Sequence, residues 1–160
     1  MNKLLLATVA MSLVRPQSCS SNAIHATTPV DDQVTITVDH SREDLIDAII
    51  QVESGGNDSA VGDRGKAVGC LQIHPIAVRE VNRILKRSKS DVRFSLLDRY
   101  SRARSIQMFN IIAEQYRFKN KTSSLEYSET IARRWNGGPR GDKKRATIKY
   151  WDKVESVLQN

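Results

Sequence analysis

The chain has 160 residues, a net charge of +7 and 39% hydrophobic residues. This length is enough for one domain with a core and short for two, and the apolar content excludes an intrinsically disordered protein. The basic balance favours an anionic partner such as nucleic acid, an acidic membrane or a cell wall, and does not choose among them.

The N-terminus has the pattern of a secretory signal peptide. After Lys3, the run Leu4–Val14 is apolar but too short to cross a bilayer, and Ser21–Ala23 offers small residues for cleavage. We therefore predict a signal peptide over residues 1–23 and a secreted or periplasmic mature protein without stable membrane insertion. Lipid attachment at Cys19 is the alternative, but the residues before this cysteine match such a site poorly.

The remaining pattern predicts a mainly helical domain over residues 41–160, preceded by a leader or linker at 24–40. Ser41 suits the N-cap of a first helix, because acidic residues follow in the first turn. Five glycines then interrupt the helical period between Ser54 and Gly69, so we predict turns or a small β-hairpin there. Further helices are predicted over Pro75–Lys86, over Ser95–Tyr116, from the capping box Ser123–Glu126 to Asn136–Pro139, and over Arg145–Leu158.

Glu53 is the first candidate for chemistry. On a helical wheel of about 100° per residue it falls between Ile46 and Ile49, in the middle of the apolar stripe of the first helix. Burial and the negative end of the helix dipole both raise the pKa of a carboxyl group there. A carboxylic acid that stays protonated near neutral pH can act as a general acid. The alternative is a glutamate at a frayed helix end that points into solvent.

Asp63 is the second candidate. It lies in the turn sequence Gly62–Gly65, where aspartates usually bond to nearby backbone N–H groups. If the glycine-rich stretch folds back as a hairpin, however, Asp63 would face Glu53 across a cleft. Two carboxylates on either side of a sugar bond are the usual apparatus of glycoside hydrolysis.

Two motifs together resemble the lysozyme superfamily. "VESGG" (Val52–Gly56) followed by "GDRGKAVGCLQI" (Gly62–Ile73) is similar to goose-type lysozymes and soluble lytic transglycosylases, in which a helix ends in the catalytic glutamate and a hairpin follows. "IARRWNGGPRGDKKRATIKYWDKV" (Ile131–Val154) resembles the invertebrate-type lysozymes of the destabilase family. The resemblance covers residues 43–157.

The resemblance implies an α+β lysozyme-like fold and a muramidase that cleaves the β-1,4 bond between N-acetylmuramic acid and N-acetylglucosamine. In that role Glu53 protonates the leaving oxygen, and Asp63 stabilises or attacks the oxocarbenium-like centre. It further implies that the sugar subsites are lined by Gln72, Asn136, Gly137 and Gly138. The expected partner is a peptidoglycan glycan strand, bound by a monomer without cofactor or metal.

The chain departs from the destabilase pattern at four places. Gly56, Val68 and Asp142 stand where that family usually has cysteine, and Trp135 stands where it usually has histidine. These differences indicate a cysteine-poor relative, and they put in doubt the isopeptidase activity reported for some members.

Two other functions remain open at this point. A lytic transglycosylase would use Glu53 alone and leave a 1,6-anhydro sugar. A non-catalytic module that binds the cell wall or nucleic acid is compatible with the charge, but the chain lacks interleaved aromatic and basic residues and any recognised DNA-binding motif. We therefore predict no nucleic-acid partner.

The remaining notable side chains have structural interpretations. Trp135 and Trp151 lie on helical stripes and are predicted in the core, although Trp135 could also stack on a sugar. His74 precedes Pro75 at a helix start, where capping is the default. Cys70 is predicted to be a small buried residue, and the basic run Arg140–Arg145 a solvated surface.

Overall fold

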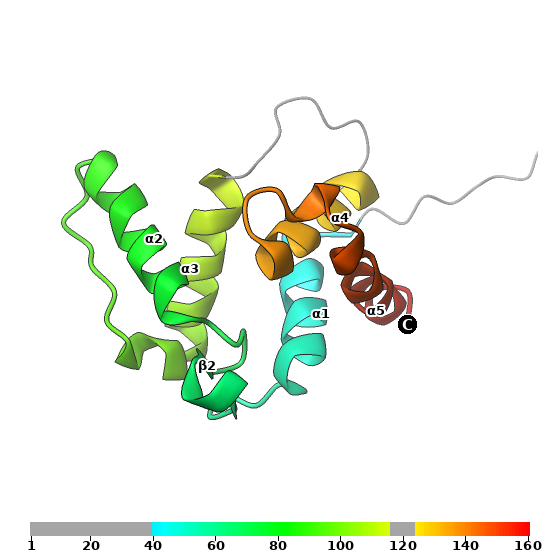
Figure 1. Cartoon of the computed structure of the whole chain (residues 1–160), viewed down its shortest axis with the longest axis horizontal. Helices are drawn as coiled ribbons and strands as arrows, with labels where there is room; N and C mark the ends of the chain where they lie inside the picture. The colour runs from blue at the N-terminus through cyan, green and yellow to red at the C-terminus, as the bar shows by residue number, and fades with distance from the viewer. Residues whose placement is uncertain (1–39, 116–123) are drawn as a thin grey trace, which may run out of the picture. The chain divides into compact units, whose positions relative to one another are not determined.

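The computed structural model describes residues 40–115 and 124–160, and this part of the chain is mainly helical (Figure 1). Its five α-helices are α1 (Arg42–Ser54), α2 (Pro75–Arg87), α3 (Arg102–Gln115), α4 (Ser124–Gly137) and α5 (Ile148–Leu158). With its one small sheet, this agrees with the predicted α+β lysozyme-like fold class. The predicted signal peptide, Cys19 and nearly all of the leader lie outside the described residues.

Helix α1 begins as its sequence predicts. The Ser41 hydroxyl accepts a hydrogen bond from the backbone N–H of Asp44, and the Asp44 carboxylate accepts one from the backbone N–H of Ser41. This capping box satisfies donors that the first turn would otherwise leave unpaired. The helix ends at Gly55, whose φ of +60° suits a glycine, and its last turn carries Glu53.

The glycine-rich stretch is the predicted hairpin. Strand β1 (Val61–Gly62) pairs antiparallel with β2 (Ala67–Val68), and the 3₁₀ turn η1 (Asp63–Gly65) joins them. An isolated bridge from Val68 to Ile73 extends the pairing toward α2. The hairpin insert, residues 55–73, therefore connects the end of α1 to the start of α2.

One hydrophobic core joins all five helices of the described part. Ile49, Phe109 and Val154 are fully buried in it, although they belong to α1, α3 and α5. Helix α1 packs against α5 and α4, while α2 packs against α3 (Figure 1). Trp151 and Cys70 are buried, as predicted.

The predicted helix start at Ser95 is wrong, since α3 begins at Arg102. Asp98 accepts hydrogen bonds from the backbone N–H and the hydroxyl of Ser95, which closes a local turn. The chain then forms the short 3₁₀ helix η2 (Leu97–Tyr100), and the α-helix α3 begins after Ser101. Side-chain bonds to nearby backbone thus compete successfully with the helical period.

The C-terminal helices follow the predicted pattern with one shift. Helix α4 ends at Gly137, within the range Asn136–Pro139 where its end was predicted. Its predicted cap, Ser123, lies outside the described residues. The predicted last helix divides into η4 (Arg145–Thr147) and α5, because the Thr147 hydroxyl donates to the carbonyls of Gly141 and Lys144. A short 3₁₀ turn, η3 (Gly141–Lys143), precedes them. Within the described ranges, no helix has the length and apolarity to cross a membrane.

Candidate active site

Glu53 points from the end of α1 toward α5. The Tyr150 hydroxyl donates a hydrogen bond of 2.8 Å to Oε1 of Glu53. Burial raises the pKa of the Glu53 carboxyl, and hydrogen bonds from the side chains of Tyr150 and Trp135 partly offset that rise. The prediction of a glutamate on the apolar side of its helix is confirmed, and the alternative of a solvent-facing side chain is wrong.

A cleft of about 880 Å³ opens beside Glu53. This volume falls in the usual range for ligand pockets, and the lining mixes apolar and polar side chains as such pockets do. One wall comes from the hairpin insert and α2, and the other from the end of α4. The lining residues that the argument uses are Glu53, Asp63, Gln72, His74, Trp135 and Asn136.

Asp63 lines the same cleft from the turn of the hairpin. Its Oδ2 lies 3.7 Å from Nε2 of His74, and the two side chains are 54% and 41% exposed. The backbone φ of Asp63 is +43° and that of Arg64 is +53°, in the left-handed region that non-glycine residues seldom adopt. Such positions often cluster at functional sites, because the surrounding structure has to hold them.

Gln72 lines the cleft but also holds the insert together. Its side-chain amide donates hydrogen bonds to the carbonyls of Gly69 and Ala60, at 2.9 and 3.3 Å. A Cβ on Gly62 would lie 2.5 Å from the Gln72 side-chain oxygen, so the strand passes closer than any other residue would allow. The predicted sugar-binding role of Gln72 therefore rests on that oxygen, since both amide hydrogens are already used.

Two arginines from the segment before and within α3 fasten the insert. The buried Arg99 donates to the carbonyls of Lys66 and Ile73, at 3.0 and 3.1 Å. Arg102 donates to the carbonyl of Gly56 and pairs with Asp58. The wall that carries Asp63 is thus attached at one end to the start of α3 and at the other to the segment just before it.

The opposite wall is the turn that follows α4. Asn136, Gly138 and Pro139 line the cleft there, and the first two are residues predicted to line the sugar subsites. Gly137 packs against Thr147 instead: a Cβ on it would meet the Thr147 methyl at 2.6 Å, and its carbonyl accepts from Lys144 Nζ. This contact gives Gly137 a packing role beside its predicted role as a subsite.

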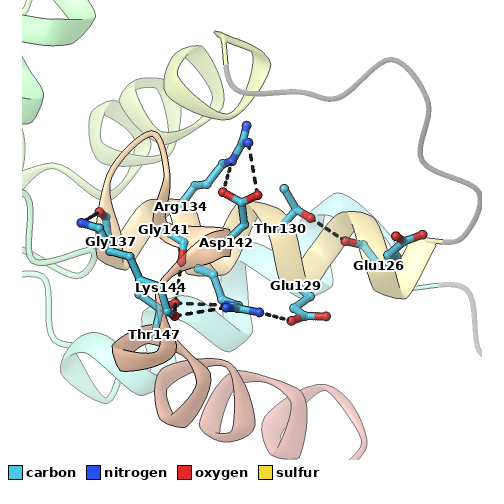
Figure 2. A network of polar contacts seen from close by, with 10 residues as sticks. Glu126, Glu129, Thr130, Arg134, Gly137, Gly141, Asp142, Lys144 and Thr147 are labelled. Carbon is cyan, nitrogen blue, oxygen red and sulfur yellow. Dashed lines mark hydrogen bonds and ion pairs between the residues drawn. The ribbon is translucent and has the colours of Figure 1, made fainter.

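A network of charged side chains fixes this turn to α4 (Figure 2). Arg134 donates to both carboxylate oxygens of Asp142, at 2.8 and 3.3 Å, and both side chains are largely buried. Arg133 bonds to Glu129, to the Thr147 hydroxyl and to the carbonyl of Lys144. Charge-assisted, two-point contacts of this kind hold a fixed geometry.

Trp135 belongs to both the core and the cleft. Its ring packs against Phe109 with the centroids 4.9 Å apart, which agrees with the predicted core role. It also lines the cleft, and its side chain helps to lower the pKa of Glu53. The stacking role considered beside the core role therefore remains compatible with its position.

Two residues of the site, one that contacts Glu53 and one that lines the cleft, were missed as site residues or given another role. Tyr150 precedes the core residue Trp151 on α5 and lies off that helix's apolar stripe, so its own helix gave no reason to select it. His74 is the N-cap residue of α2, but its side chain makes no capping bond and lines the cleft. Among the described residues, no group of His, Cys, Asp and Glu side chains could hold a metal ion.

The Tyr150–Glu53 bond leads to a prediction about pH. The Tyr150 hydroxyl stabilises the ionised Glu53 carboxylate, so Tyr150→Phe should raise the pKa of Glu53 further. A general acid is active only while protonated, hence the alkaline limb of the pH–rate profile should move to higher pH. Tyr100→Phe, at an exposed tyrosine outside the cleft lining, should leave the profile unchanged.

Comparison with known families agrees with this geometry. Residues 35–97 match the family described as the transglycosylase SLT domain. The match covers α1, the hairpin insert and α2, so this part of the chain is similar to a transglycosylase SLT domain. The segment Ile131–Val154, which carries the resemblance to the destabilase family, lies outside the matched residues. No curated protein and no solved structure matches the chain significantly.

Proposed function

We propose that this protein cleaves the β-1,4 bond between N-acetylmuramic acid and N-acetylglucosamine in peptidoglycan, with Glu53 as the general acid. The observation that carries the proposal is the Glu53 carboxyl itself, which is largely desolvated, bonded to Tyr150 and open to a cleft of about 880 Å³. A carboxyl with a raised pKa can deliver its proton to the leaving glycosidic oxygen.

The cleft suits a sugar chain. Trp135 offers an aromatic face, Asn136 an amide, and the turn at Gly138 backbone groups for the sugar hydroxyl and acetamido groups. These are the kinds of groups that orient a polar ligand in a largely apolar pocket.

The two carboxylates favour hydrolysis as the route. Glu53 is desolvated, whereas the Asp63 side chain is 54% exposed and lies beside His74 in the same cleft. A contrast of this kind separates an acid from a partner that stabilises or attacks the developing oxocarbenium centre. Water then supplies the hydroxyl group that completes hydrolysis, and a proton returns to Glu53.

Asp63→Asn tests this route. If Asp63 stabilises or attacks the reacting centre, the amide should lower the cleavage rate about a hundredfold, because it cannot carry the negative charge. The rate is measured as release of soluble fragments from purified peptidoglycan. Asp152→Asn, at an exposed aspartate on α5, is the matched control and should not change it. Near-normal activity of the Asp63 variant would remove Asp63 from the chemistry.

Lytic transglycosylation is the second candidate, and the family match favours it. In that route Glu53 acts first as acid and then as base toward the muramic acid 6-hydroxyl, and no second carboxylate is needed. Mass spectrometry of the products separates the routes: reducing muramic ends indicate hydrolysis, and 1,6-anhydro ends indicate transglycosylation.

The place of action that fits this substrate is outside the cytoplasm. The apolar run Leu4–Val14 and the small residues before residue 24 support export. Detection of the mature protein in the medium or periplasm, with an N-terminus near residue 24, would test it.

A further inference from the structure

Helix α2 carries a basic stripe that the proposed reaction does not use. Arg79, Arg83, Lys86 and Arg87 fall at about 0°, 40°, −20° and 80° on a wheel of 100° per residue, so they share one face. All of them are exposed. Given a rise of about 1.5 Å per residue, the successive charges are separated by about 6, 4.5 and 1.5 Å along the helix, over roughly 12 Å in all.

The stripe has more positive than negative charge, because Glu80 is the carboxylate that pairs with it in the described structure. Within the part of the chain that the structure describes, the side chains of Arg79 and Lys86 have no hydrogen-bonding or ion-pair partner. Arg83 forms a two-point ion pair with Glu80, and the charge of Arg87 also lowers the pKa of the Glu80 carboxyl. Surface charges of one sign that gather without partners create a local potential that attracts the opposite charge. The stripe is therefore available to an anionic partner.

The stripe borders the cleft. Arg83 lines the cleft together with Ile76 and Glu80 of the same helix. A polymer that lies along the stripe would therefore run next to a glycan strand bound beside Glu53. In Figure 1, α2 lies beside α3 and away from α5, so the face opposite α3 is not covered by another described helix.

We propose that this stripe binds a phosphodiester polymer of the cell envelope, with one negative charge per repeat, which lies alongside the glycan strand. This inference rests on the proposed function, because that function brings the protein to the wall. Arg79 and Arg87 carry guanidinium groups, whose planar forks match phosphate oxygens, whereas the fork of Arg83 is held by Glu80. A flexible chain that carries a phosphate in every repeat can adjust to charges that are unevenly spaced over this length.

Two other anionic partners fit the helix less well. A membrane-surface helix buries its apolar side in lipid, but Val78 and Val81 of α2 are buried in the core and Leu85 packs against it. Single-stranded nucleic acid is usually held by aromatic stacking in addition to charge, and the stripe has no aromatic residue. Both remain as outcomes of the experiment.

The experiment measures binding of the full chain to a glycerol-phosphate polymer as a function of salt. The variant Arg79→Gln/Lys86→Gln/Arg87→Gln keeps Arg83, which lines the cleft. We expect its affinity at low salt to fall about tenfold or more, and the slope of log K against log salt to fall by about 2, as for the loss of three phosphate contacts on a single strand.

The matched control is Arg145→Gln/Lys149→Gln/Lys153→Gln. It removes the same number of positive charges from exposed positions outside the cleft lining. This control should bind the polymer like the wild type. Equal weakening in both variants would overturn the proposal, because it would show an effect of net charge alone. Tighter binding of the wild type to an oligonucleotide or to phosphatidylglycerol vesicles than to the polymer would also overturn it.

Cleavage of peptidoglycan from which the polymer has been stripped is measured in parallel. Both triple variants should cleave it at the wild-type rate. Absence of cleavage by the wild type would contradict the proposed function and leave the binding result intact, so the two failures are distinguishable.

Discussion

Replacing Glu53 with glutamine is expected to lower the rate of peptidoglycan cleavage by about three orders of magnitude, within the usual effect of a general acid. Glutamine has nearly the same shape, and its oxygen can still accept the Tyr150 hydrogen bond. What it lacks is the proton that the leaving oxygen requires. The rate is measured as release of soluble fragments from purified peptidoglycan.

The same substitution should not destabilise the fold, and this separates a chemical effect from a structural one. The pKa of Glu53 is raised above 4.5 in the folded protein, so the folded state holds the proton more tightly than the unfolded chain. Its contribution to stability is complete below pH 4.5 and declines as the pH rises through the folded pKa. A neutral glutamine has no such decline.

Thermal unfolding at mildly acidic and mildly alkaline pH tests this sign. The glutamine variant should unfold at the wild-type temperature or higher under alkaline conditions, and the difference should shrink under acidic ones. Wild-type activity in the variant would contradict both enzyme mechanisms, because each of them takes its proton from Glu53. A variant that is inactive and also unstable at alkaline pH would indicate that the carboxylate supports the fold.

The position of Glu53 could be predicted because its cause is local. The apolar residues Ile46, Ile49 and Ile50 define one face of α1, and a wheel places Glu53 on it. The five glycines that follow predict a turn in the same way, and the hairpin from Val61 to Val68 confirms it. Periodicity and turn chemistry act within a few residues, so one sequence shows them.

The groups that meet Glu53 could not be predicted, because they come from far along the chain. Tyr150 is separated from Glu53 by 97 positions, and only the packing of α1 against α5 brings them together. Trp135 was predicted in the core. Whether its ring also lines the cleft depends on where α4 ends in the tertiary structure. The partners of a site residue thus require the tertiary structure.

The false helix start at Ser95 has a different origin. The apolar stripe of α3 is real, since Met108, Phe109 and Ile112 are buried, but it does not say where the helix begins. Hydrogen bonds from Ser95 to the Asp98 side chain close a turn here, so the helix begins later than the pattern predicts. The buried Arg99 in this segment donates hydrogen bonds to the hairpin insert instead. The segment from Ser95 to Ser101, which the apolar pattern predicts as helix, therefore holds the hairpin insert in place.

The close contact between the hairpin insert and the segment before α3 gives the largest expected effect of a substitution on stability. The insert approaches the segment before α3 so closely that a Cβ on Gly69 would lie 1.9 Å from the Arg99 carbonyl oxygen. Gly69 also has a φ of +82°, which disfavours any side chain. Gly69→Ala should therefore lower the free energy of unfolding by about 3 kcal/mol, near the upper end for overpacking.

Relief of this clash is restricted on both sides. The Arg99 carbonyl accepts from the buried Ser105 hydroxyl, and the Arg99 guanidinium holds Lys66 and Ile73. A shift that makes room for the methyl group would move the wall that carries Asp63. Cleavage activity should therefore fall even at temperatures where the variant remains folded.

Gly65→Ala separates the clash from the backbone conformation. Gly65 has a similar φ of +87°, but a Cβ there would meet no atom within 4 Å. Its substitution should cost only the left-handed penalty of about 1–2 kcal/mol. The free energy of unfolding of each variant is measured by urea unfolding. A smaller decrease for Gly65→Ala than for Gly69→Ala would show that the difference comes from the contact with Arg99. Equal losses would mean that the insert moves freely, and then its attachment to Arg99 could not be what keeps Asp63 in the same cleft as Glu53.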